Sequence, residues 1–175
     1  MNTKIILVII AMLGGFGASA QEFEKPAEGK SLVYFVRSSG TGALINFKYF
    51  DGEEYLGKLN GMNYIAYECD PGEHIFWVAA ENREYMKGDL KPNATYVIQV
   101  KPVIGAVKSA VRLFQLSADD EKPLAKAKKL MTKKQPSKLK GQEEDMAFFI
   151  KNGMERYQKD LVLNKVKVIN SEWTF

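Results

Sequence analysis

The chain has 175 residues, of which 46% are hydrophobic and 26% are charged, and its formal net charge is +4. This length is enough to bury the core of one domain, or of one domain with an appendage. The composition excludes a chain that is disordered throughout, because such chains combine few apolar residues with a high net charge.

The first twenty residues have the pattern of a secretory signal peptide. Lys4 gives a positive start, Ile5 to Leu13 form an apolar segment, and the tripeptide ASA at 18–20 is the small-x-small pattern that signal peptidase accepts. The apolar segment is shorter than a stable membrane-spanning helix requires. We therefore expect cleavage near Ala20, a mature chain without a transmembrane segment, and a periplasmic or secreted location.

Residues 31–80 alternate short apolar runs with turn signals. The run 31–37 (SLVYFVR) is apolar on both faces, which indicates a central strand covered on both sides, and 43–50 alternates like a half-exposed strand. Turn signals follow at Asp51-Gly52, Asn60-Gly61 and Asp70-Pro71-Gly72. The runs between these turns predict an antiparallel meander, in which Trp77 is a core anchor.

Residues 81–93 are interpreted as a polar connection, and two further strands are predicted at 94–103 and 106–116. Short, evenly spaced strands separated by turn signals are typical of sandwiches and small barrels. The sequence therefore predicts a mainly β protein, an antiparallel β-sandwich of about seven or eight strands.

From Ser117 the hydrophobic period becomes helical. The stretch 117–120 (SADD) resembles a helix cap, so a helix is predicted from there, or from Pro123, to about Met131. A second helix is predicted from about 142 to 161, and 162–169 is interpreted as a last strand or an extended tail. The predicted organisation is a signal peptide (1–20), a β-sandwich domain (21–116) and a helical, lysine-rich C-terminal extension (117–175).

The second predicted helix has a continuous apolar stripe, which must pack on something. Either it packs on the sandwich or the first helix, or it forms a surface for a partner. The candidate partner surface consists of Met146, Phe149, Ile150 and Tyr157.

Positive charge is concentrated in the extension. The segment Lys122 to Lys140 contains eight lysines and no acidic residue. Such a run is either a solvated face or a contact for an anionic membrane surface or an acidic envelope protein. Nucleic acid is disfavoured as a partner, because the run lacks arginine and interleaved aromatic residues.

Residues typical of enzymes are sparse. His74 is the only histidine and Cys69 the only cysteine, and the chain has no HExxH, CxxC or GxSxG motif. We therefore expect a non-enzymatic protein without catalytic residues, metal site or cofactor. Cys69 lies in a predicted strand, where a buried thiol is expected, although an exposed thiol could pair between two chains.

Two stretches resemble a known family. AEGKSLVYFVR at 27–37 and YFDGEEYLGKLNGMNYIAYECDPGEHIFWV at 49–78 resemble the bacterial family called domain of unknown function 2846. The second stretch is also similar to PEGA-type surface modules. The resemblance covers about residues 27–116, implies an exported sandwich domain and brings no catalytic motif. The matching positions are Gly29, Lys30, Val33, Tyr34, Arg37, Asp51, Gly52, Gly57, Leu59, Gly61, Tyr64, Pro71, Gly72 and His74.

The leading hypothesis is an exported, non-enzymatic β-sandwich protein of the bacterial envelope that acts by binding or as an interaction module. The alternative is a carrier of a small apolar ligand, with a pocket lined by Tyr49, Tyr64, Phe76 and Trp77. An unrecognised enzyme is the third hypothesis, and it would require a polar pocket with strongly perturbed carboxylates.

Overall fold

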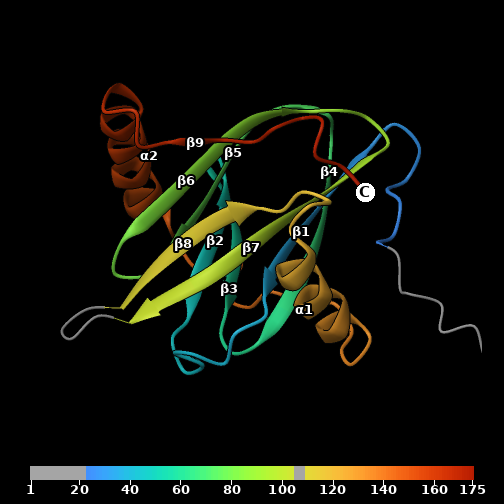
Figure 1. The fold of residues 1–175 in the computed structure, drawn as a ribbon. Helices are drawn as coiled ribbons and strands as arrows, with labels where there is room; N and C mark the ends of the chain where they lie inside the picture. The colour runs from blue at the N-terminus through green and yellow to red at the C-terminus, as the bar shows by residue number, and fades with distance from the viewer. Residues whose placement is uncertain (1–22, 105–108) are drawn as a thin grey trace, which may run out of the picture.

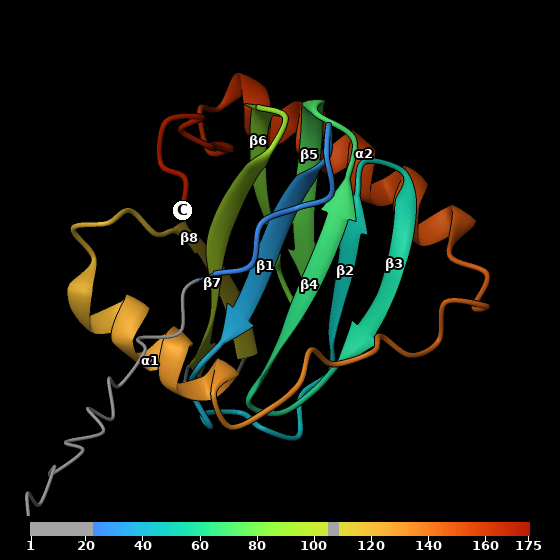
Figure 2. The ribbon, with the colours of Figure 1, turned by 90° about the vertical axis from the view of Figure 1, so that its right-hand side faces the viewer.

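The computed structural model describes residues 23–104 and 109–175, so the predicted signal peptide lies outside the described residues. The described chain forms two β-sheets packed face to face, with one helix on the outer face of each sheet (Figures 1 and 2). The predicted mainly β sandwich with a helical C-terminal extension is confirmed. The described residues form nine strands, against the seven or eight predicted.

The first sheet has the order β4 (Asn63–Cys69), β1 (Ser31–Arg37), β7 (Ala94–Ile104) and β8 (Ser109–Gln115). The second has the order β3 (Glu54–Leu59), β2 (Phe47–Asp51), β5 (Gly72–Ala79), β6 (Arg83–Leu90) and β9 (Lys167–Val168). The helices are α1 (Glu121–Met131) and α2 (Ala147–Val162).

Strand β1 is the centre of the first sheet, as its two apolar faces predicted. It pairs antiparallel with β4 and parallel with β7, and each of its seven residues is buried. Because strand side chains alternate between faces, Val33 and Phe35 enter the core between the sheets, whereas Tyr34 and Val36 pack beneath α1.

The predicted meander is wrong beyond its first hairpin. β2 and β3 pair with each other, but β4 crosses to the first sheet and pairs with β1, and β5 returns to pair with β2. The turns at Asn60-Gly61 and Asp70-Pro71-Gly72 therefore connect the two sheets. A turn signal specifies that the chain reverses, and it carries no information on which sheet receives the next strand.

The interpretation of residues 81–93 as a polar connection is also wrong, because this segment contains β6. β6 pairs antiparallel with the whole length of β5. Met86 and Leu90 are buried in the core between the sheets, and Tyr85 faces α2. Only three apolar residues mark this strand, and the charged residues between them conceal its alternation.

Both helices were predicted, and both begin later than their earliest predicted residue. α1 begins at Glu121, with Pro123 in its first turn, where a missing N–H costs no helical hydrogen bond. α2 begins at Ala147, whose N–H donates to the Asp145 carboxylate (3.0 Å). No helix among the described residues is long and apolar enough to cross a membrane.

The C-terminal extension covers edges of the sandwich on two sides. Between α1 and α2, Ser137 donates its N–H to Tyr64 of β4 (2.8 Å), and Lys140 pairs with Lys58 of β3. Figure 2 shows this connection passing the ends of β4 and β3. On the other side, β9 pairs with β6. A covered edge cannot template pairing with another chain, so the extension blocks such pairing at these parts of the edges.

Cys69 is buried, as its position in a strand predicted. Its thiol lies 3.8 Å from the carbonyl oxygen of Ser31, the first residue of the neighbouring strand. A thiol in this position is not available for pairing between two chains.

Candidate functional site

The four residues predicted to line an apolar pocket are buried in three different places. Tyr49 and Phe76 lie in the core between the sheets, and the Phe35 ring contacts both of them, with centroid distances of 5.8 and 5.4 Å. Tyr64 packs beneath α1 and Trp77 beneath α2. The structure therefore does not bring the four side chains together around one pocket. Neighbouring strand residues such as Phe76 and Trp77 point to opposite faces of a sheet.

The apolar stripe of α2 packs on the second sheet, which was one of its two predicted alternatives. Phe149 stacks on Phe50 and Trp77, with centroid distances of 5.8 and 6.0 Å, and Met146 and Ile150 pack against the same cluster. Tyr157, also on this stripe, is 4% exposed. The predicted partner surface therefore contacts the second sheet, and of its four residues Ile150 also lines a hollow at the surface.

A glycine permits this close contact between α2 and the sheet. A Cβ atom on Gly153 would lie 2.5 Å from the Trp77 ring, and the Gly153 carbonyl accepts a hydrogen bond from the Tyr85 hydroxyl (2.7 Å). The helix can approach Trp77 this closely only because residue 153 has no side chain.

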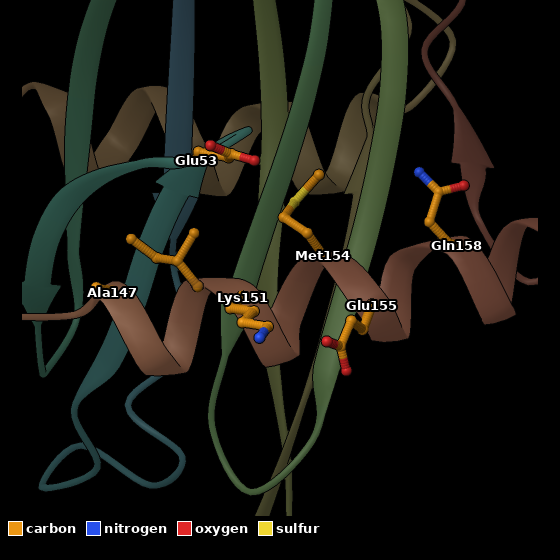
Figure 3. A pocket seen from close by; sticks show the side chains of 7 residues that line it. Glu53, Ala147, Lys151, Met154, Glu155 and Gln158 are labelled. Carbon is orange, nitrogen blue, oxygen red and sulfur yellow. The ribbon is translucent and has the colours of Figure 1, made fainter.

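A hollow of about 720 Å³ lies between α2 and the turn that joins β2 to β3. Figure 3 shows Lys151 and Glu155 extending from one side of the helix, and Met154 and Gln158 from the other. Glu53 completes the lining from the turn. Charges of both signs alternate around this hollow, so its lining favours no particular ligand.

A second hollow, also of about 720 Å³, lies beside α1 and is lined by lysines; we call it the basic groove. Its five lysines are Lys101, Lys122, Lys126, Lys129 and Lys133. No acidic residue lines it, and none of the five lysines forms an ion pair within residues 23–104 and 109–175. All five side chains are exposed.

The helical period of α1 positions most of these charges. Lys122, Lys126 and Lys129 are spaced by four and three residues, which places them on one face of the helix. The opposite face packs on the first sheet through buried residues such as Leu124 and Ala127. Like charges at this spacing repel each other, and a bound anion would remove that repulsion.

The other wall of the basic groove comes from distant parts of the chain. Ser38 and Ser39 follow β1, and Gln99 and Lys101 belong to β7. Hydroxyl and amide groups can donate hydrogen bonds to an anion that the lysines attract. The lysine run was evident in the sequence, but these four residues were missed, because no local pattern connects them to it.

His74 lies in a separate polar cluster, which has a structural role. Its Nδ1 lies 2.6 Å from Asp51 Oδ2, and its Nε2 lies 2.8 Å from the Asp70 carbonyl oxygen. The Tyr67 hydroxyl also donates to Asp51 (3.2 Å). The hydrogen bond that the ring donates to the Asp51 carboxylate raises the pKa of His74 to about 10. A charged ring that donates through both nitrogens ties the end of β2 to the turn before β5.

This charged ring predicts a pH-dependent stability. The folded-state pKa of His74 is raised from 6.5 to about 10, so its contribution is complete below pH 6.5 and is lost as the pH rises towards 10. We expect this loss to lower the free energy of unfolding by about 2 kcal/mol, the usual value of hydrogen bonds to a charged group. Urea denaturation at pH 6 and pH 10 measures it. The His74→Gln variant should lack this part of the change, and an equal change in both proteins would contradict the assignment.

The described residues include no group of three or more His, Cys, Asp or Glu side chains that could hold a metal ion. No model of a known protein family matches the chain, and no curated protein matches it significantly.

Proposed function

We propose that this is an exported, non-enzymatic binding protein of the bacterial envelope, and that its basic groove takes a ligand with several negative charges. The observation that carries the proposal is the gathering of five lysines, unpaired among the described residues, around one hollow without a carboxylate. The predicted signal peptide and the resemblance to exported sandwich domains support export and a binding role.

The chemistry of the groove favours oxyanions such as phosphate, sulfate or carboxylate. Lysine ammonium groups act as mobile point charges that adapt to anions of different shape, and the Ser38 hydroxyl and the Gln99 amide add hydrogen-bond donors. The alternative of an apolar-ligand carrier has no comparable support, because its four aromatic residues lie in three separate clusters.

Reversing two groove charges should abolish most of the binding. We expect residues 21–175, the chain predicted after signal-peptide cleavage, to bind inorganic polyphosphate at low salt. Lys126→Glu/Lys129→Glu should weaken this binding by about tenfold or more, because two attractive charges become repulsive at short range. Isothermal titration calorimetry measures the affinity. Both side chains are exposed, so the fold should be retained.

A matched control separates a site from an effect of net charge. Lys151→Glu/Lys159→Glu makes the same change in charge on α2, where both lysines are also exposed. This control should bind polyphosphate nearly as well as the wild type. If it loses as much affinity as the groove variant, binding follows overall charge and the proposed site is wrong.

A further inference from the structure

We infer that the groove's ligand is the surface of an anionic phospholipid bilayer, against which the protein lays α1 and the uncovered part of its first sheet. This inference rests on the proposed function and specifies its ligand. It comes from an arrangement that a soluble anion does not require: exposed apolar side chains border the lysines.

The outer face of the first sheet is only partly covered. α1 packs over residues of β1 and β4 and over Val97 of β7. Further along β7, Gln99 and Lys101 line the basic groove, and their antiparallel partners on β8 are Phe114 and Arg112. Paired residues lie on the same face of a sheet, so the uncovered face directly continues the groove. Figure 1 shows that α1 leaves much of β7 and β8 uncovered.

Three partly exposed apolar residues lie on this surface. Met62 lines the groove and is 41% exposed, Phe114 adjoins it and is 43% exposed, and Val103 follows Lys101 on the same face and is 41% exposed. Lys167 Nζ lies 4.3 Å from the centroid of the Phe114 ring, so cationic and apolar groups alternate here.

The charge of this surface comes from the groove itself. Arg112 and Lys167 both pair with Glu84, at 3.2 and 2.8 Å, so their charges are partly neutralised. The five groove lysines have no such counter-charge among the described residues. They would contact the phosphates of the bilayer while the neighbouring apolar side chains enter the headgroup region.

A bilayer fits this surface better than the other sources of negative charge. A soluble polyanion would engage the lysines and leave the three apolar residues in water. An acidic protein is disfavoured, because lysine is depleted at protein–protein interfaces and their apolar cores are contiguous. Here exposed apolar side chains and lysines occupy one surface, and binding at a membrane surface combines burial of apolar area with attraction to anionic lipids.

Vesicle sedimentation tests the inference. We expect residues 21–175, the chain predicted after signal-peptide cleavage, to bind vesicles of phosphatidylglycerol and phosphatidylcholine. This binding should weaken as the salt concentration rises, and vesicles of phosphatidylcholine alone should not be bound. Phe114→Ser should weaken vesicle binding by about tenfold, since one aromatic contact with lipid is lost, and should leave polyphosphate binding unchanged. Val103→Ser, at another of the three apolar positions, should act in the same direction, so that the result does not depend on correct folding of the first variant alone. Phe148→Ser, at a position on α2 that is 79% exposed, is the matched control and should bind both ligands normally.

The outcomes separate this inference from the proposed function. Binding of polyphosphate without binding of anionic vesicles overturns the lipid surface and leaves the anion site intact. Unchanged vesicle binding in both Phe114→Ser and Val103→Ser also overturns it, as does equal binding to neutral vesicles. If the wild type binds neither polyphosphate nor anionic vesicles, both the lipid inference and the proposed function are wrong.

Discussion

Replacing Trp77 with alanine should lower the free energy of unfolding by about 3–5 kcal/mol, the usual cost of removing a large aromatic side chain from a core. The Trp77 ring is fully buried and stacks on Phe50, with centroids 3.7 Å apart and planes at 7°. Its Nε1 donates to the Gly52 carbonyl (2.9 Å), and its outer edge meets Gly153 of α2. Removing the ring would therefore open a cavity and leave a carbonyl without its partner.

Urea denaturation followed by far-ultraviolet circular dichroism measures this loss without depending on tryptophan fluorescence. Trp173→Ala is the matched control, because that ring is 43% exposed. We expect the control to lose less than about 1 kcal/mol, as partly exposed positions usually do. Equal losses in the two variants would mean that Trp77 does not anchor α2 to the sheet.

Replacing Arg37 with alanine should cost about 3 kcal/mol, which is the second large effect. Arg37 is 1% exposed, and its guanidinium donates to the carbonyl oxygens of Ile45 (3.0 Å), Thr41 (3.3 Å) and Gly42 (2.5 Å). It also lies over the Phe47 ring, 4.2 Å from the centroid. The alanine variant would remove the three hydrogen bonds of this charged group and its packing on the Phe47 ring.

The Arg37→Lys variant tests the geometry of this contact, since it keeps the charge. A single ammonium group cannot reproduce a planar fork that reaches three carbonyls and stacks on a ring, so we expect about half of the loss. The same denaturation experiment compares the two variants. If lysine restores full stability, charge alone suffices. Because Ser38 and Ser39 of the basic groove follow Arg37 directly, the alanine variant should also weaken polyphosphate binding.

Much of the secondary structure could be predicted because its signals are local. The two apolar faces of 31–37 indicated a central strand, and the stripe that includes Phe149 and Tyr157 indicated a helix packed on one side. Both follow from the direction in which successive side chains leave a strand or a helix, which a short window of sequence contains. Strand β6 was not predicted, because its few apolar residues stand among charged ones.

The pairing of the strands could not be read from the same signals. Asn60-Gly61 has the sequence of a hairpin turn, yet the strands on its two sides belong to different sheets. That choice depends on β1, which needs a neighbour at each edge and takes β4 and β7. Competition among strands distant in sequence decides it, and no local pattern records the result.

The candidate site also has one part that the sequence predicts and another part that depends on tertiary packing. The sequence by itself determined the excess of lysine in the extension and the helical spacing that places Lys122, Lys126 and Lys129 on one face. Only the tertiary structure decided that this face adjoins Lys101 and Phe114, and that the aromatic residues of the predicted pocket lie apart. A charge pattern on one helix is a local property, whereas the groove exists because packing brings that helix against strands from another part of the chain.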